Sequence, residues 1–132
     1  MSYPIRTKPI LKVIIAGSRS FDDYDTLEEV CKEILAEYWD HRNIVIISGG
    51  AAGADYQGEV FAYQNQLSLS TFKAQWKQYG KVAGHLRNEV MAKEADMLIA
   101  FWDGASKGTE NMIKLARKHN LEYYVHMIKG ES

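Results

Sequence analysis

Short apolar runs rich in β-branched residues alternate along this chain with segments that repeat apolar residues every three or four positions. KVIIAG (12–17), NIVIIS (43–48) and DMLIAFW (96–102) are such runs, and a turn follows each of them. Buried strands separated by amphipathic helices are typical of βαβ units with a parallel sheet. The alternation therefore predicts an α/β, three-layer Rossmann-like fold with helices on both faces of the sheet.

Two further segments complete a sheet of about five strands. LSLSTFKA (67–74) alternates as a weaker edge strand, and LEYYVHMI (121–128) closes the sheet. The helices between the strands are expected over residues 27–39, from the turn at 48–55 to about 66, 85–95 and 109–120.

The segment QWKQYGKVAG (75–84) contains two glycines and no clean period, so it is predicted to be a loop. The helix after it is expected to turn Leu86, Val90 and Met91 toward the core.

Length and composition favour one globular domain. The chain has 132 residues, of which 46% are hydrophobic and 25% charged, which argues against a disordered or fibrous protein. Pro4 and Pro9 predict an extended arm over residues 1–10 and leave 11–132 as the single domain. The formal net charge of −1 argues against a general nucleic-acid partner, which usually requires a basic surplus.

The cysteine, hydropathy and histidine patterns bear on the compartment of the protein and on metal binding, and the single cysteine indicates a reducing compartment. Cys31 is the only cysteine, so we interpret it as a buried apolar residue. The N-terminal segment lacks a signal-peptide core and no apolar run reaches membrane-spanning length, which predicts a cytoplasmic protein with no membrane association. No metal and no resident cofactor are expected, because the histidines are scattered: His41, His85, His119 and His126.

The stretch SGGAAGAD (48–55) follows the second buried strand directly. Its small residues suit a tight turn into a helix packed close to the sheet. A glycine-rich turn at a helix N-terminus also exposes backbone N–H groups that bind anions. The two explanations are compatible with the sequence, and the neighbouring loops favour the second.

Right-handed crossovers place four strand-to-helix loops at the carboxyl edge of the sheet, where open α/β folds bind ligands. Three of these four loops combine glycine or small residues with hydroxyl groups, and three supply a cation, which suits a phosphate neutralised by arginine or lysine. An aromatic residue of the third loop, Trp76 or Tyr79, could cover a base or sugar. The ligand-binding candidates are Gly17, Ser18, Arg19, Gly49, Gly50, Ala51, Gly53, Trp76, Lys81, Arg87, Asn88, Ser106, Gly108 and Thr109. We therefore expect a nucleotide-like ligand.

Two common nucleotide-binding classes are excluded. GSRSFD after the first strand lacks the G-x-G-x-x-G fingerprint, and no G-x-x-x-x-G-K-[ST] motif occurs in the chain. A hydride-transfer dehydrogenase and a P-loop nucleotidase both need one of these patterns.

Four ordered motifs resemble the SLOG superfamily of Rossmann-like domains, and its small single-domain YspA branch, related to YpsA, in particular. They are GSRSF, SGGAAGAD, FKAQWKQYGKVAGHLRN followed by Met91, and FWDGASKGT, and the likeness covers about residues 11–126. The superfamily includes the LOG phosphoribohydrolases, the DNA-processing protein DprA and nucleotide-sensing domains. The resemblance implies binding of a nucleotide or nucleotide derivative and assembly into a homodimer or higher homo-oligomer.

The LOG pattern is only partly present. Arg87 matches the LOG arginine, and Gly108 and Thr109 match the G-T pair of the P-G-G-x-G-T-x-x-E loop. Met112 stands where the LOG glutamate belongs, and Glu110 lies next to the threonine instead. The resemblance therefore supports phosphate binding more strongly than LOG-type hydrolysis.

Three hypotheses follow, and a binding or sensing domain for a nucleotide-derived molecule is favoured. The alternative is hydrolysis of an N-glycosidic or phosphoester bond, with Asp55, Asp103 or Glu110 as the catalytic carboxylate and Arg87 holding the phosphate. Each carboxylate also has a structural explanation, because acidic residues stabilise helix starts and turns. Single-stranded DNA binding through the aromatic and basic residues of the third loop ranks lowest.

Overall fold

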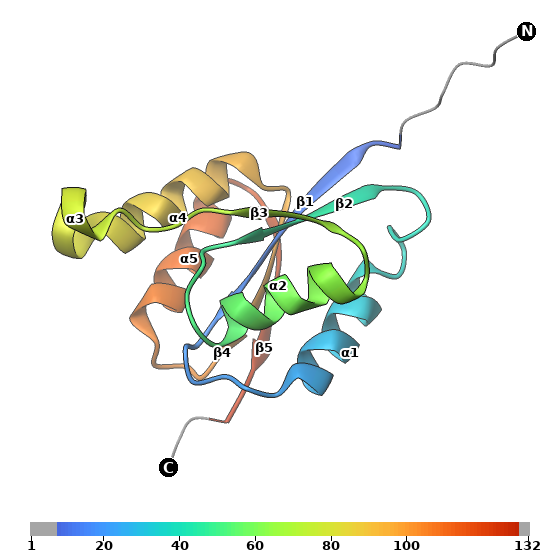
Figure 1. Ribbon diagram of the computed structural model, residues 1–132, viewed down its shortest axis with the longest axis horizontal. Coiled ribbons are helices and arrows are strands. Elements are labelled where there is room, and N and C mark those ends of the chain that lie inside the picture. Colours follow the sequence, from blue (N-terminus) through green and yellow to red (C-terminus); the bar gives the residue numbers. More distant parts are fainter. Residues whose placement is uncertain (1–7, 130–132) are drawn as a thin grey trace, which may run out of the picture.

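The computed structural model describes residues 8–129 and contains a five-stranded sheet in which every pair of neighbouring strands is parallel (Figure 1). The strand order is β3-β2-β1-β4-β5, so the chain direction across the sheet reverses between β1 and β4. The strands are β1 (Ile10–Gly17), β2 (Asn43–Ser48), β3 (Ser68–Thr71), β4 (Met97–Trp102) and β5 (Glu122–Met127). In open α/β sheets the crevice at such a reversal binds ligands.

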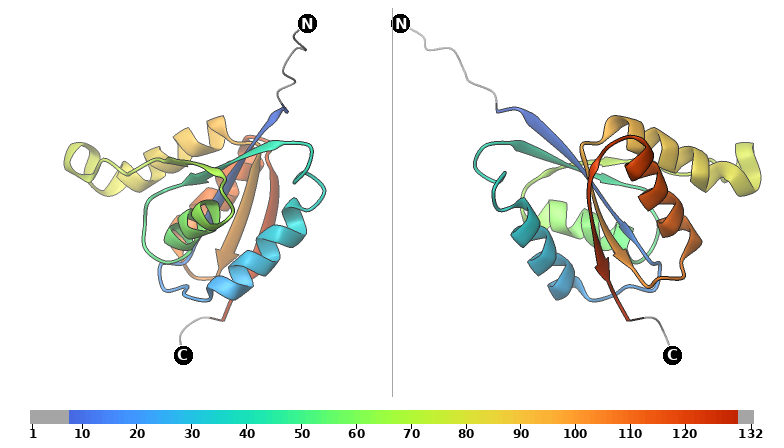
Figure 2. Two further views of the ribbon diagram at one scale, coloured as in Figure 1. Left: turned by 45° about the vertical axis from the view of Figure 1, so that its right-hand side comes forward. Right: turned by 180° about the vertical axis from the view of Figure 1, so that it is seen from behind.

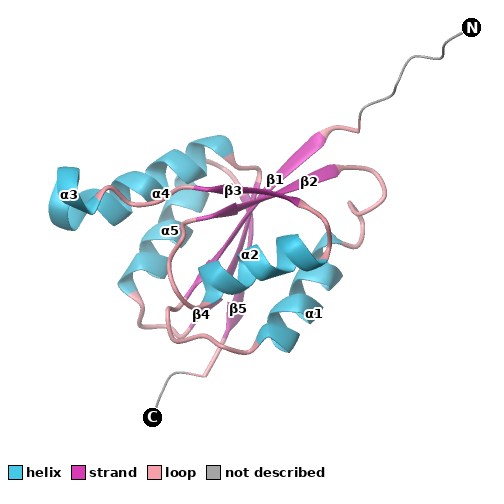
Figure 3. Cartoon of the chain, viewed as in Figure 1, coloured by secondary structure: helices cyan, strands magenta, loops and turns pink. Residues whose placement is uncertain are grey.

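Helices α1 and α2 cover one face of the sheet, and α4 and α5 cover the other (Figure 2). A short helix α3 and one turn of 3-10 helix project from the start of α4 (Figure 3). The helices are α1 (Tyr24–Leu35), α2 (Ala54–Gln64), α3 (Trp76–Tyr79), the 3-10 turn (Gly80–Val82), α4 (Ala83–Glu94) and α5 (Lys107–Lys118). This arrangement confirms the predicted α/β fold with two helical layers.

Two buried layers hold the helices on the sheet. Leu27 and Phe61 fill the layer beneath α1 and α2, and Met91 and Met112 fill the layer beneath α4 and α5. Each fully buried side chain of this size contributes about 1.5–3 kcal/mol relative to an exposed one. Cys31 is fully buried in the first layer, and this burial raises its thiol pKa to about 12, so it serves as an apolar packing residue.

The prediction of a loop over residues 75–84 is wrong. Residues Trp76–Tyr79 form α3, and Gly80, with φ of +59°, ends that helix by donating its N–H to the Trp76 carbonyl. The chain then continues through the 3-10 turn into α4, which begins at Ala83. The glycine therefore acts as a helix C-cap between two helical segments, a role that composition alone does not distinguish from a loop.

The predicted inward face of α4 is also partly wrong. Met91 is buried as expected, but Leu86 and Val90 are 44% and 45% exposed. The buried face of α4 uses small and polar residues instead, among them Ala83 and Asn88. Apolar periodicity misleads here because the inward face borders a polar cavity.

The first strand begins earlier than predicted. Ile10 pairs with Asn43 in the β1–β2 ladder, and the Asn43 N–H donates to the Pro9 carbonyl at 2.9 Å. The predicted arm over 1–10 therefore loses its last residue to β1, while residues 1–7 lie outside the described part of the chain.

Other boundaries differ more modestly. Helix α1 ends at Leu35 rather than 39, although Tyr38 and Trp39 still pack against the buried layer from a series of turns. Strand β3 covers only Ser68–Thr71 of the predicted 67–74. Among the helices of residues 8–129, none is both long and apolar enough to cross a membrane.

Candidate functional site

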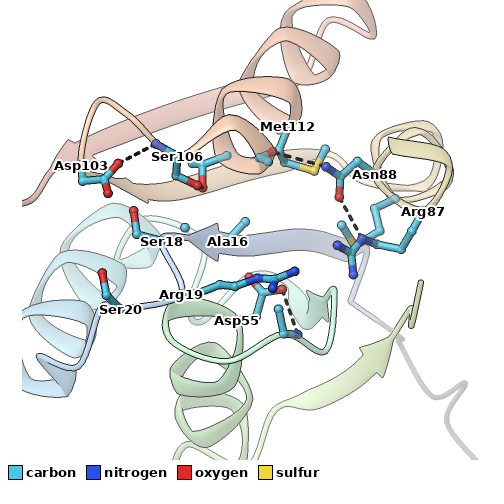
Figure 4. Close-up of a pocket in the computed structure, with 15 residues that line it drawn as sticks. Ala16, Ser18, Arg19, Ser20, Asp55, Arg87, Asn88, Asp103, Ser106 and Met112 are labelled. Atoms are coloured by element: carbon cyan, nitrogen blue, oxygen red, sulfur yellow. Dashed lines mark hydrogen bonds between the residues drawn. The ribbon is translucent and has the colours of Figure 1, made fainter. Parts of the chain in front are cut away.

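A cavity of about 430 Å³ opens at the carboxyl edge of the sheet, between the ends of β1 and β4 (Figure 4). The loops after β1 and β4 form part of its wall, and the first turns of α2 and α5 and the middle of α4 form the rest. We call it the inner cavity, and its lining residues are Ala16, Gly17, Ser18, Arg19, Ser20, Ala51, Asp55, Arg87, Asn88, Met91, Asp103, Ser106, Gly108, Thr109 and Met112. Its volume lies in the range of small-ligand sites.

The glycine-rich loop before α2 serves both packing and the site. Gly53 has φ of +76°, and a Cβ atom there would lie 2.4 Å from the carbonyl oxygens of Ser18 and Arg19. The neighbouring Ala54 N–H donates to the Ser18 carbonyl at 3.2 Å. Gly53 therefore fixes the contact between the loops after β1 and β2 and does not itself line the inner cavity.

Arg87 of α4 joins three elements at the site. Its Nε donates to Asn88 Oδ1 at 2.9 Å, and its Nη1 donates to the carbonyls of Gly49 and, at 3.4 Å, Phe72. Within the described residues Nη2 makes no hydrogen bond, which leaves two N–H donors for a ligand. The guanidinium is thus held in place by protein carbonyls while one end stays available.

The side chain of Asn88 connects Arg87 to the first turns of α5 through hydrogen bonds. It is 5% exposed, and its Nδ2 donates to Asn111 Oδ1 at 2.9 Å and to the Gly108 carbonyl at 3.4 Å. Since the Asn88 oxygen accepts from Arg87, the amide is fully oriented by its neighbours. The first turn of α5 and the Arg87 guanidinium are therefore parts of one hydrogen-bonded network.

The charged residues that line the cavity are Arg19, Arg87, Asp55 and Asp103, and of these Asp55 is the buried one. Asp55 is 7% exposed and accepts from the Ala51 N–H at 3.3 Å. Burial raises the pKa of Asp55, against the opposing effects of the Ala51 N–H, Arg87 and Arg19. Burial lowers the pKa of Arg87, the negative charge of Asp55 opposes this shift, and the positive charge of Arg19 adds to it. Both arginines are thus close enough to repel each other.

The N-terminus of α5 forms the opposite wall. Ser106 precedes the helix, and its hydroxyl lies 3.2 Å from the buried hydroxyl of Thr109. The first N–H groups of a helix have no intrahelical acceptor and carry the positive end of its dipole. Met112, at the position that corresponds to the LOG glutamate, is 2% exposed and lines the same cavity.

A second depression adjoins the inner cavity and shares Arg19, Ala51 and Arg87 with it. This outer hollow has a volume of about 340 Å³, and its other lining residues are Gly49, Gly50, Ala52, Lys73, Ala74 and Trp76. A Cβ atom at Gly49 would lie 2.7 Å from Arg87 Nη1 and 2.8 Å from Asp55 Oδ2, so a side chain there would displace both groups. Trp76 is 52% exposed at its rim.

Most of the predicted site residues therefore lie at one of these two hollows. Glu110 does not line either one: it pairs with Lys114 at 3.1 Å and Lys107 at 3.9 Å, and the Lys114 hydrogen bond lowers its pKa. Lys81 is exposed in the 3-10 turn and also lies outside both hollows. Among the described residues no cluster of His, Cys, Asp and Glu is suited to hold a metal ion.

Several lining residues had no signal in the sequence. Ala16 and Met91 belong to apolar patterns that predict core, and Lys73 lies in a segment expected to be a strand. Asn111 orients Asn88 without lining either hollow. The placement of α4 beside α5 brings Asn111 to Asn88, whereas Ala16 and Lys73 reach the hollows from the ends of β1 and β3.

Residues 11–79 match the family described as "YspA, cpYpsA-related SLOG family". The chain belongs to this family. This SLOG protein is also 33% identical over 116 residues to the gene 61 protein of Mycobacterium phage D29, across 81% of this chain and 89% of the phage protein. The resemblance to the YspA branch is thereby confirmed.

Solved structures share the fold of this SLOG protein. DNA processing protein A (DprA) from Streptococcus pneumoniae superposes with a TM-score of 0.68 at 18% identity, across 94% of this chain and 51% of DprA. The chain thus spans about half the length of that protein. TM1055, a structural genomics target, superposes with a TM-score of 0.58 at 16% identity, across 89% of this chain and 72% of TM1055. At such identities the likeness shows the fold alone.

Proposed function

We propose that this SLOG protein binds a nucleotide or nucleotide-derived small molecule, with the anionic group in the inner cavity. The observation that supports this most directly is the pairing of Arg19 and Arg87 beside one cavity, with Asp55 as the carboxylate that acts on both. Arg19 is exposed and Arg87 is half-buried, and an anion bound beside both guanidinium groups would be attracted to each of them. A phosphate is such an anion and also accepts hydrogen bonds from guanidinium and helix N–H groups.

The outer hollow suggests where the rest of such a ligand extends. It continues from Arg87 toward Trp76, whose indole face is half exposed and suited to stack on a planar base. An extended ligand therefore fits the two hollows better than inorganic phosphate alone.

A thermal-shift panel tests this proposal with AMP, ADP-ribose, NAD, cyclic nucleotides, cyclic ADP-ribose isomers and a short single-stranded oligonucleotide. A ligand at a hundred times its Kd stabilises by about 2.7 kcal/mol, which raises the Tm of a domain of this size by roughly 10 °C. Arg19→Met should weaken binding about tenfold through loss of one charge-assisted hydrogen bond. Arg117→Met, on the exposed last turn of α5, is the matched control and should retain wild-type affinity.

No shift with any small molecule would contradict the proposal. A shift with the oligonucleotide alone, weakening steeply with salt, would instead favour the single-stranded DNA alternative.

Hydrolysis of an N-glycosidic bond is the second candidate, and the buried carboxylate of Asp55 favours it. Burial raises its pKa, as is typical of carboxyl groups that donate protons in catalysis. In such a reaction Asp55 protonates the departing base nitrogen as the bond to the anomeric carbon breaks. Water then adds to that carbon and returns a proton to the carboxylate. Met112 replaces the LOG glutamate, so Asp55 would have to act without that residue.

Asp55→Asn separates the two candidates. The amide removes a negative charge near both arginines, so a binding protein should hold its anionic ligand as tightly as the wild type or more tightly. A hydrolase using Asp55 should lose turnover by at least about a hundredfold. Ligand affinity by calorimetry and product release by chromatography measure the two effects on the same sample.

The same variant has a defined effect on stability. The pKa of Asp55 is raised in the folded state. The stability that this shift contributes is therefore fully present below the pKa of the unfolded state, and it is lost as pH rises through the pKa of the folded state. The amide of the Asp55→Asn variant does not titrate, so the variant should gain stability relative to the wild type between about pH 4 and about pH 7.5. Urea unfolding at both pH values measures this difference, and an equal difference at both values would contradict the assignment.

A further inference from the structure

One end of the inner cavity is not explained by anion binding. Ser18 follows β1, and Asp103 follows β4, so the two residues face each other across the reversal in the sheet (Figure 4). Neither is a cation, and a carboxylate opposes a phosphate. This end therefore calls for a different part of the ligand.

The Ser18 hydroxyl is buried without a partner. The residue is 2% exposed, and within residues 8–129 its Oγ makes no hydrogen bond. Both backbone polar groups of Ser18 are hydrogen-bonded: the N–H donates to the Phe101 carbonyl at 3.0 Å, and the carbonyl accepts from the N–H groups of Phe21 and Ala54. The backbone of Ser18, and with it the Cβ atom that carries the hydroxyl, is therefore fixed at the cavity wall.

Asp103 presents the complementary group. Its Oδ1 accepts from the N–H groups of Ala105 and Ser106, both at 2.8 Å, and these bonds hold its pKa below the usual range. The Ser18 hydroxyl, as a nearby donor, also lowers that pKa, although the two groups do not meet the geometry of a hydrogen bond. A charged oxygen and a hydroxyl thus face each other with their hydrogen-bonding capacity unfilled.

We propose that Ser18 and Asp103 form a subsite for a hydroxyl group of the ligand, of the kind that a pentose carries. A hydroxyl fits both residues, because it can donate to the carboxylate and accept from the serine in the same position. The subsite lies in the cavity that also contains Arg19 and Arg87, which suits a sugar phosphate. This inference rests on the proposed function and assigns the residues that bind the sugar of such a ligand.

Calorimetry with inorganic phosphate, ribose 5-phosphate and AMP tests the subsite on the full chain. Wild-type protein should bind ribose 5-phosphate at least about tenfold more tightly than inorganic phosphate, the gain expected from hydrogen bonds to a charged partner. Ser18→Ala should remove most of this advantage and leave the Kd for inorganic phosphate unchanged. Asp103→Asn should also remove most of it, and should bind inorganic phosphate as tightly as the wild type or more tightly, because a negative charge is lost from the cavity. Asp40→Asn, exposed at the opposite edge of the sheet, is the matched control.

Both variants are designed to keep the fold. The amide in Asp103→Asn retains an oxygen for the N–H groups of Ala105 and Ser106, while its second terminal atom becomes a donor. Ser18→Ala removes a buried hydroxyl that lacks a partner, so the Tm without ligand should stay the same or rise. A falling Tm in Ser18→Ala would contradict the assignment of an unfilled hydroxyl.

The outcomes separate the two proposals. Equal affinities for ribose 5-phosphate and phosphate, or an advantage that survives in both variants, would overturn the subsite and leave anion binding intact. Failure of phosphate, ribose 5-phosphate, AMP and ADP-ribose to bind at all would overturn the proposed function together with the subsite.

Discussion

Gly53→Ala is expected to lower the free energy of unfolding by more than about 3 kcal/mol, because two separate costs add at this position. The backbone has φ of +76°, which L side chains rarely adopt, and the new Cβ would lie 2.4 Å from two backbone carbonyl oxygens. Those carbonyls, of Ser18 and Arg19, belong to the loop after β1, and the Ser18 carbonyl cannot move without breaking the bonds from the N–H groups of Phe21 and Ala54. Urea unfolding followed by circular dichroism measures the loss.

Gly80→Ala is the matched control for this prediction. Gly80 also has a positive φ, +59°, but no atom lies within 4 Å of the position of its Cβ. Gly80→Ala should therefore lower the free energy of unfolding only through the unfavourable backbone conformation, by about 1–2 kcal/mol. If the two variants lost equal stability, the close contact between the loops would have no energetic weight, and the explanation for Gly53 would fail.

Arg87→Met is expected to weaken ligand binding by roughly a hundredfold or more, equivalent to about 3 kcal/mol. The methionine removes the charge that the anion would neutralise, and it also releases the Gly49 carbonyl that Arg87 holds beside the outer hollow. Both the anion site and the loop geometry are affected, which makes this the largest effect on binding among the site residues. Calorimetry with the ligand that stabilises the wild type most measures it.

Arg87→Lys separates charge from geometry in the same position. Lysine keeps the positive charge but cannot donate to Asn88, to Gly49 and to a ligand with the planar arrangement of a guanidinium. It should therefore bind with an affinity between those of the wild type and Arg87→Met. Wild-type affinity in Arg87→Met would show that Arg87 is a structural link between α4 and the loops and has no part in binding, whereas wild-type affinity in Arg87→Lys would show that the positive charge alone suffices.

Predictions from the sequence were most successful where burial alone decides the structure. The strand Asn43–Ser48 agrees with its predicted bounds because a continuous β-branched run has few alternatives inside a sheet. They failed at α4, where Leu86 and Val90 face outward and the helix begins within a predicted loop. There the inward face borders a polar cavity, so apolar periodicity no longer reports which side is buried.

The three candidate carboxylates at the site show the same limit of prediction from the sequence. The sequence presents Asp55, Asp103 and Glu110 as equivalent candidates, each near the start of a helix. Packing distinguishes them: Asp55 is buried beside the arginines, Asp103 holds a turn and faces Ser18, and Glu110 pairs with two lysines on the surface. Their directions depend on how each helix docks, which local sequence does not encode.

The sequence by itself determined the α/β class, the parallel sheet and the edge at which its glycine-rich loops meet. It did so because strand and helix periods are local properties and because crossover connections have one hand. Only the tertiary structure decided that Gly53 serves packing, that Arg19 and Arg87 line one cavity, and that the Ser18 hydroxyl has no hydrogen-bond partner within residues 8–129. Burial and pairing of side chains arise from residues far apart in the sequence, so they are settled only when the helices have docked on the sheet.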